Sequence, residues 1–251
     1  MHRFVSALVT TTLAAGLLTV APAAWADDCP DPGAPITGVS PTPDDVVLGP
    51  LASTSTRVFV DGYAGCFSSF ENPYVRVLAP HREIIVDLSE GPPPFDGGVE
   101  YEGQLTIDTS ELEDADAGTW LLSFEAEGRR YAERSFSVRR ASTLSFNAGP
   151  EPVRRKVTFA GKLRRASWER SRFEGVKGER VRILRLGPVE TPNPKRVALL
   201  TTEKKGKYSN KQPFPGTDRY QATYAGTAAV AAVSSRVDAV ASRADAVKSG
   251  G

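Results

Sequence analysis

Apolar and β-branched residues come in short runs along most of the chain, and polar residues alternate with them inside many of these runs. Clusters of Gly, Pro, Asn and Asp, such as 149–152 and 213–216, separate the runs. A period of two residues is typical of a strand with one buried face, and turn residues at close intervals indicate many short strands. Since neither half shows a convincing period of 3.6 residues, the pattern predicts an all-β sandwich fold.

The second half of the chain shows this pattern most clearly. The runs that we expect to form strands are Ser142–Ala148, Lys156–Leu163, Glu179–Leu186, Arg196–Thr202, Lys207–Gln212 and Arg219–Ala225. From Val230 onward, valines follow a three-four spacing that suits one face of a helix, and the surrounding alanines favour helix. A sandwich needs a closing strand in this region, so we predict a strand over Arg236–Ala241.

The two halves also carry a weak internal repeat with a spacing of about 100 residues. The matched pairs are Val58–Gly62 with Val157–Gly161, Val75–Leu78 with Val181–Leu184, Glu102–Leu105 with Lys205–Tyr208, and Trp120 and Phe124 with Tyr220 and Tyr224. Their order is the same in both halves. We therefore predict two successive sandwiches, residues 27–139 and 140–243, followed by a disordered tail over 244–251.

The stretch from Leu112 to Trp120 contains an Asp-x-Gly-x-aromatic pattern, formed by Asp116, Gly118 and Trp120. In an immunoglobulin-type domain this pattern opens strand F, and the polar tip of the aromatic side chain bonds back to the turn before the strand. Leu122 stands where an antibody domain has an inter-sheet cysteine. The sequence thus predicts two tandem immunoglobulin-like β-sandwiches, of which the first is held by packing.

The same acidic stretch resembles half of a calcium loop. The ligands of such a site would be Asp108, Glu111, Glu113, Asp114 and Asp116. An EF-hand needs a further acidic or amide ligand, a central glycine and a distal bidentate Glu, whereas Gly118 takes the next alternate position here. We favour a solvated acidic turn and keep a calcium site in this turn as the alternative.

Residues 1–26 have the features of a signal peptide. A short basic start is followed by a mostly apolar run and by the small-x-small sequence Ala24-Trp25-Ala26. We expect export, a mature chain that begins at Asp27, no membrane span after cleavage, and an extracellular or cell-wall location. Because such compartments are oxidising, Cys29 and Cys66 are expected to form a disulfide.

The formal net charge of +1 conceals a division between the halves. Residues 27–139 hold 7 Arg, no Lys and 21 Asp plus Glu, so 7 minus 21 gives −14. Residues 140–251 hold 23 Lys plus Arg and 9 Asp plus Glu, so 23 minus 9 gives +14. A charge division of this kind favours attraction to oppositely charged partners and carries no information on the fold.

Few residues in the predicted mature chain suit catalysis. It has a single histidine, His81, and this count excludes zinc sites built from several His or Cys ligands. We expect His81 to stand in a surface turn. The Gly-x-Ser-x-Gly motif of a nucleophile elbow is absent. We therefore expect no catalytic residues and no cofactor; paired carboxylates in the acidic half leave a secreted hydrolase with a basic accessory domain as the less favoured alternative.

A basic and aromatic segment is the strongest candidate for ligand binding. Its members are Arg164, Arg165, Trp168, Arg170, Arg172, Phe173 and Lys177. Arginine side chains bind phosphate and carboxylate groups bidentately, and aromatic rings stack on sugars or bases. The alternative is that the two aromatic residues belong to the core and the arginines to a solvated loop between strands.

A resemblance to a known family covers about residues 140–241. The runs 142–154, 161–168 and 224–227 resemble the C-terminal β-sandwich module of a family of small secreted actinobacterial proteins. The resemblance implies an immunoglobulin-like module and export, and it implies no site residues because no activity is established for the family. The proline-rich stretch 186–196 departs from the family's pattern and predicts an irregular loop.

Together these features favour a secreted, non-catalytic binding or structural protein. We expect it to act at the cell envelope, with an anionic polymer or a protein as the partner of the basic second sandwich. The alternative is self-association of chains through their oppositely charged sandwiches, and a hydrolase is the least favoured hypothesis.

Overall fold

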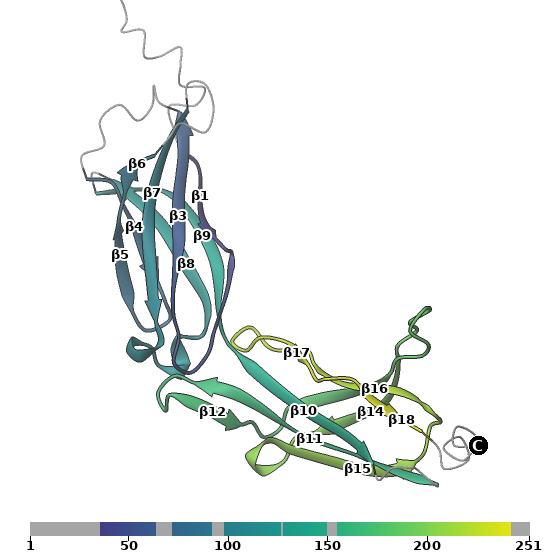
Figure 1. The fold of residues 1–251 in the computed structure, drawn as a ribbon. Helices are drawn as coiled ribbons and strands as arrows, with labels where there is room; N and C mark the ends of the chain where they lie inside the picture. Colours follow the sequence, from purple (N-terminus) through teal and green to yellow (C-terminus); the bar gives the residue numbers. More distant parts are fainter. Residues whose placement is uncertain (1–35, 64–71, 92–97, 127, 150–154, 242–251) are drawn as a thin grey trace, which may run out of the picture.

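The computed structural model describes residues 36–63, 72–91, 98–126, 128–149 and 155–241. Within these ranges the chain is almost entirely β-strand and forms two β-sandwiches (Figure 1). The predicted all-β fold class is confirmed. The predicted signal peptide, the tail 244–251 and both Cys29 and Cys66 lie outside the described residues. No helix in the described ranges is long and apolar enough to cross a membrane.

The first sandwich packs a four-stranded sheet on a five-stranded sheet. The first sheet has the order β1 (Ile36–Thr42), β3 (Ser53–Tyr63), β7 (Gly98–Asp108) and β6 (Ser89–Glu90). The second has the order β2 (Asp45–Leu48), β9 (Arg129–Arg140), β8 (Gly118–Ala126), β4 (Tyr74–Leu78) and β5 (Glu83–Asp87). This order corresponds to strands A, B, E and D facing the G, F and C strands of an immunoglobulin domain. Among the pairs of named strands in the described ranges, β2–β9 is the parallel one, and an isolated parallel bridge also joins Arg140 to Val230.

The second sandwich repeats this plan. One sheet consists of β10 (Ser142–Gly149), β11 (Lys156–Ser167), β12 (Arg172–Gly175) and β15 (Lys207–Pro213). The other consists of β14 (Lys195–Thr201), β13 (Arg180–Arg185), β16 (Asp218–Tyr224), β17 (Val233–Ser234) and β18 (Asp238–Val240). All six predicted strands are present. The closing strand is shorter than expected and is split between β17 and β18, and no helix forms there because both segments pair with β16.

The internal repeat corresponds to equivalent strands. Its first pair of segments lies in β3 and β11, its second in β4 and β13, and its last in β8 and β16. The third pair matches only in part: its first member lies within β7, whereas Lys205 and Gly206 belong to the short 3-10 turn η3 (Lys204–Gly206) before β15. A shared topology thus underlies the weak similarity between the halves.

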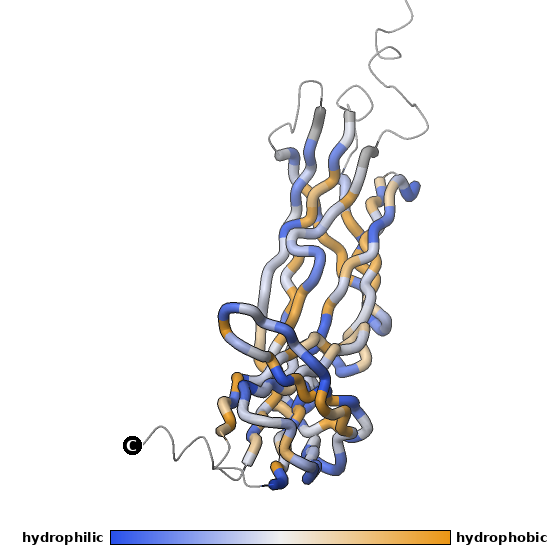
Figure 2. Tube along the Cα trace, turned by 90° about the vertical axis from the view of Figure 1, so that its right-hand side faces the viewer, coloured by the Kyte–Doolittle hydropathy of each residue, from blue (hydrophilic) through white to orange (hydrophobic). Residues whose placement is uncertain are grey.

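Alternation of side chains builds a core in each sandwich. In β4 the inward Val75 and Val77 are fully buried, and in β13 the fully buried Val181 and Ile183 alternate with the exposed Arg180 and Arg182. Figure 2 shows hydrophobic segments along the strands and hydrophilic segments in many of the connecting turns. Burial of apolar area at about 25 cal/mol per Å² stabilises both sandwiches.

Each sandwich has an aromatic corner at the start of its strand F. The indole Nε1 of Trp120 donates a hydrogen bond of 2.7 Å to the carbonyl oxygen of Asp116. In the second sandwich the hydroxyl of Tyr220 donates to the carbonyl oxygen of Gly216, also four residues upstream. The predicted bond from Trp120 back to the E–F turn is confirmed, and the repeat extends to this feature.

We expect Tyr220→Phe to lower the free energy of unfolding of the second sandwich by about 1 kcal/mol, because the substitution removes one hydrogen bond and keeps the ring in place. Urea denaturation of the two chains measures the difference. Equal stability of variant and wild type would show that the corner bond does not contribute.

Candidate functional site

The acidic turn, in which the sequence left a calcium site as an alternative, forms two short 3-10 turns, η1 (Thr109–Glu111) and η2 (Asp114–Asp116). Asp108 Oδ1 accepts hydrogen bonds from the backbone nitrogen and the hydroxyl of Ser110, at 2.8 and 2.7 Å. These bonds lower the pKa of Asp108. Glu111 forms an ion pair of 3.6 Å with Arg82. Both carboxylates therefore have protein partners.

The other carboxylates of the turn are also engaged. Asp116 is buried, and its Oδ2 accepts from the backbone nitrogen of Glu113 at 2.9 Å in a capping box at the start of η2. In the described part of the chain no three His, Cys, Asp or Glu side chains converge on a point that could hold a metal ion. The arrangement thus favours a structural turn over calcium coordination.

Asp114 links the acidic turn to the basic and aromatic segment of the second sandwich. Its Oδ1 accepts from the backbone nitrogen of Trp168 at 2.8 Å, and its Oδ2 lies 2.8 Å from Arg140 Nη1. Its backbone nitrogen donates to Glu169 Oε1 at 3.3 Å. The two stretches singled out from the sequence as separate ligand sites are therefore in contact with each other.

The aromatic residues of the predicted ligand site lie where these two stretches meet. We name this region the joint and define it by Asp114, Arg140, Trp168 and Phe173. Trp168 is 2% exposed and belongs to the core cluster of the first sandwich. Phe173 is half-buried against the same cluster. A buried indole has no face open to a sugar or base, so the prediction that Trp168 stacks on a ligand is wrong. The alternative given above, in which the two aromatic residues belong to the core, fits the structure.

The basic residues of the same segment do not form one surface. Arg170 and Arg172 both bind Glu174, at 3.1 and 2.9 Å, and these bonds lower the pKa of that carboxyl. Arg164 is exposed on β11, and Lys177 is exposed between β12 and β13. The remaining member, Arg165, is half-buried. Burial and, after it, the charge of Arg165 lower the pKa of Arg140.

Backbone hydrogen bonds reinforce the joint. Strands β9 and β10 are separated by the single residue Ala141, whose nitrogen donates to the carbonyl of Leu48 at 2.8 Å. The nitrogen of Arg140 donates to Ala229 at 3.0 Å, and its carbonyl accepts from Ala231 at 2.9 Å. The bond to Leu48 reaches the first sandwich, and the bonds with Ala229 and Ala231 reach the second. The connection is therefore bonded to both units, which fixes the orientation that Figure 1 shows.

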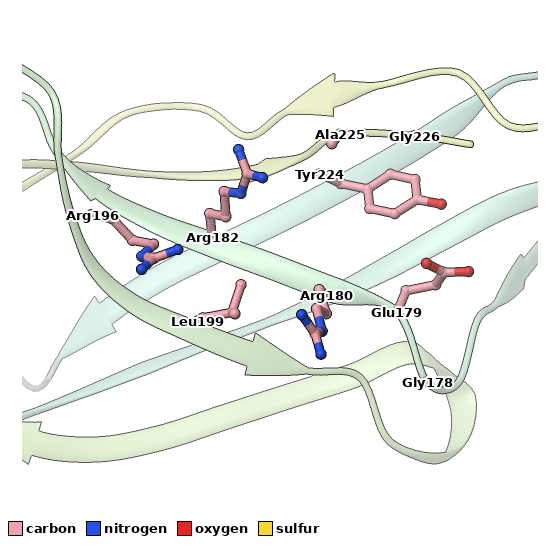
Figure 3. A pocket seen from close by; sticks show the side chains of 9 residues that line it. All are labelled: Gly178, Glu179, Arg180, Arg182, Arg196, Leu199, Tyr224, Ala225 and Gly226. Carbon is pink, nitrogen blue, oxygen red and sulfur yellow. The ribbon is translucent and has the colours of Figure 1, made fainter. Parts of the chain in front are cut away.

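A different part of the second sandwich has the features of a ligand site. A shallow hollow of about 410 Å³ lies over β13 and β14. We name it the arginine hollow and define it by Arg180, Arg182, Arg196, Leu199, Glu179 and Tyr224. In Figure 3 the guanidinium groups of Arg182 and Arg196 lie toward one end, and Glu179 with the hydroxyl of Tyr224 lies at the other.

The local sequence explains why the three arginines and Leu199 share the outer face of this sheet, whereas Tyr224 pairs with the buried Val181 and belongs to the core. Arg180 and Arg182 alternate with the buried Val181 along β13, so both arginines point away from the core. Arg182 pairs with Leu199 in the neighbouring strand β14. Leu199 is 43% exposed. The hollow therefore combines cationic groups with an open apolar side chain.

At the other end of the hollow, the hydroxyl of Tyr224 is already hydrogen-bonded to the carboxylate of Glu179. Burial raises the pKa of Tyr224 to about 12, and Glu179 adds to the rise. The hydroxyl therefore stays neutral over the physiological pH range. Guanidinium groups donate several hydrogen bonds and bind phosphate or carboxylate groups well, so the arrangement suits an anion attached to an apolar or sugar-like body.

Sequence inspection missed these three arginines because they are dispersed over 17 positions and two strands. The available signal was the alternation Arg180-Val181-Arg182-Ile183, which places two cations on the outward face of one strand. His81, by contrast, lies exposed in the turn between β4 and β5, as predicted.

Comparisons with known proteins add little to this geometry. No family model and no curated protein sequence matches the chain. Among solved structures, a DUF4785 family protein of Legionella pneumophila is 13% identical with a TM-score of 0.38, and the match covers 74% of this chain and 51% of that protein. The ectodomain of mouse nectin-like molecule 4 is 11% identical with a TM-score of 0.29, covering 84% and 65%.

A Salmonella alpha-2-macroglobulin mutant is 14% identical with a TM-score of 0.34, covering 84% of this chain and 15% of that protein. The chain thus matches less than two thirds of the length of each of these structures. At this similarity the assignment as tandem immunoglobulin-like sandwiches depends on the strand order and on the aromatic corners described above.

Proposed function

We propose that the protein is an exported, non-catalytic binding protein that attaches to an anionic polymer of the cell envelope. The arginine hollow of the second sandwich is the attachment site. The predicted signal peptide supports export, and the net charge of +14 over residues 140–251, 23 minus 9, supports attraction to a polyanion.

The proposal rests on three neighbouring arginines that have no carboxylate partner among the described residues. In the described residues Arg180, Arg182 and Arg196 form no ion pair, although they lie together on one sheet face. Among the arginines that the structure describes, ten others do have a carboxylate partner; Arg185 on the same strand, for example, binds Asp218 at 2.7 Å. Three neighbouring cations without counter-ions favour an anionic ligand.

The chemistry of the hollow narrows the ligand class. Each arginine can bind a phosphate or carboxylate oxygen pair, while Leu199 offers apolar contact to the carbon skeleton between charged groups. The hollow is shallow and open, which fits a length of polymer better than an enclosed small molecule. We expect repeating units that carry phosphate or carboxylate groups.

The test uses the chain from residue 27 onward with polyglycerol phosphate, polyglutamate and neutral dextran. We expect binding to at least one polyanion, no binding to dextran, and weaker binding at about 500 than at about 50 mM salt. Replacing Arg180, Arg182 and Arg196 with Ser should weaken binding about 10- to 100-fold, because exposed charged hydrogen bonds contribute less than the roughly 1.5–3 kcal/mol of typical ones. The two polyanions distinguish phosphate from carboxylate.

A control variant separates the site from net charge. Arg57, Arg129 and Arg134 are exposed on the first sandwich, so their replacement with Ser removes the same charge at a distance from the hollow. We expect this variant to bind within about twofold of wild type. An equal loss in both variants, or binding to neither polyanion, would contradict the proposed function.

A further inference from the structure

The first sandwich has a small acidic face on the outer side of its strands β3 and β7. Asp61 on β3 stands directly opposite Glu100 on β7, and Glu102 follows on the same side. We name these three residues the acidic face. Glu102 lies 4.0 Å from Arg57, whereas Asp61 and Glu100 have no ion pair within the described ranges. Like charges directly opposite each other in a sheet destabilise the pair.

The second sandwich has a basic face on the outer side of the equivalent strands. Lys162 on β11 stands directly opposite Lys207 on β15. Arg164, Lys205 and Lys211 lie on the same side or in the adjoining turn, and these five residues are named the basic face. None of them forms an ion pair with another described residue, so this face also carries uncompensated like charges.

Both faces disfavour their own charge. Burial, Asp61 and Glu102 raise the pKa of Glu100. Burial and the neighbouring cations Arg164, Lys207 and Lys205 lower the pKa of Lys162. An opposite charge brought close to either residue would reverse its shift, because an opposite charge favours the ionised form. Contact between the two faces would therefore stabilise both.

The fold prevents this contact within one chain. The acidic face lies at the end of β3 remote from the joint, since Ser53 pairs with Asp108 at the joint end and Asp61 lies eight positions further along. Eight residues of strand span about 26 Å. The joint holds both sandwiches through backbone bonds and the Asp114–Arg140 pair, so the faces can meet only between two chains.

We infer that the acidic face of one chain docks on the basic face of a second copy, and that this contact links chains head to tail. Because the two faces are different surfaces, a row of docked chains keeps an unoccupied acidic face at one end and an unoccupied basic face at the other. A heterologous contact of this type extends into open assemblies unless its rotation closes a ring. The basic face lies on the opposite sheet from the arginine hollow, so an assembled chain keeps its hollow accessible to polymer.

Sedimentation velocity of the chain from residue 27 onward tests the contact without any polymer. We expect the weight-average mass at least to double at about 20 mM salt and to return to the monomer value at about 500 mM. The variants Lys162→Glu/Lys207→Glu and Asp61→Lys/Glu100→Lys should each remain monomeric at low salt. The control Lys177→Glu/Lys195→Glu changes the net charge of the chain by the same amount as the basic-face variant, at two exposed lysines outside that face. It should assemble as wild type does.

Mixing the two reversed variants gives the deciding result. The first keeps the native acidic face and the second keeps the native basic face, so the equimolar mixture should assemble although neither variant does so alone. Misfolding cannot produce that recovery. A mixture that stays monomeric overturns the inference, and so does wild-type assembly that both reversals leave unchanged. If reversal of the basic face weakens polymer binding and leaves assembly intact, the face serves the polymer and self-docking is wrong.

Discussion

Replacing Trp168 with alanine is expected to destabilise the first sandwich by about 3–5 kcal/mol, the usual cost of removing a large buried aromatic side chain. Trp168 follows β11 of the second sandwich, yet its side chain is 2% exposed and packs in the core cluster of the first. The substitution therefore leaves a cavity where the two units meet. Urea denaturation followed by the fluorescence of Trp120, the other tryptophan after residue 27, measures the effect on the first sandwich.

Two further variants test whether the loss comes from the volume of the Trp168 side chain and is specific to the first sandwich. The indole Nε1 of Trp168 is buried and has no hydrogen-bond partner among the described residues, so Trp168→Phe loses volume without losing a bond and should cost about 1–2 kcal/mol. Phe159→Ala creates a cavity in the second core and should leave the Trp120 transition in place. If Trp168→Ala instead shifts only the second sandwich, the packing across the joint does not contribute.

The substitution Asp114→Asn is expected to lower the stability of the joint by about 3 kcal/mol. Arg140 has a side chain only 7% exposed, and Asp114 is its carboxylate partner at 2.8 Å. Removing one member of a buried pair leaves an uncompensated buried charge, which usually costs about 3–5 kcal/mol. We take the lower end because the Asp114 side chain is 26% exposed. Asparagine keeps an oxygen for the backbone nitrogen of Trp168, so the loss reports on charge.

Thermal denaturation and amide hydrogen exchange at Arg140 and Trp168 measure this effect. The control is Asp44→Asn, which removes an ion pair of 3.0 Å with Arg134 whose side chains are 59% and 47% exposed. An exposed pair contributes about 0–1 kcal/mol, so this control should unfold nearly as wild type does. Equal losses in both variants would show that burial of Arg140 adds nothing to its pairing.

Local patterns in the sequence were sufficient for the strands and for the corner. The alternation in β13 predicted a strand because Val181 and Ile183 must face a core, and Asp116-x-Gly118-x-Trp120 predicted a bond that depends on residues only four positions apart. Such features need no knowledge of distant contacts. The same holds for the repeat, since equivalent strands carry similar local patterns.

Contacts between distant residues were not predictable in this way. Asp114 and Trp168 are separated by 54 positions, and each had a plausible role of its own, as a calcium ligand or a stacking surface. Nothing in composition or spacing indicates that the two meet, because the angle between two sandwiches depends on the packing of their ends. The like-charge pairs on the two sheets were hidden for the same reason: their members become neighbours only through strand register.

The parallel pairing of β2 with β9 determines how the first sandwich would respond to mechanical tension. Strand β2 stands near the beginning of the sandwich, and β9 leads directly into β10 through one residue. When the chain is pulled from both sides, parallel neighbours are drawn past each other, and the hydrogen bonds between Asp45–Leu48 and Ser137–Arg140 are loaded together in shear. Bonds loaded in this way must break as a group, whereas an antiparallel hairpin opens one bond at a time. A protein anchored at one end and linked to its neighbours at the other would thus resist extension at this strand pair.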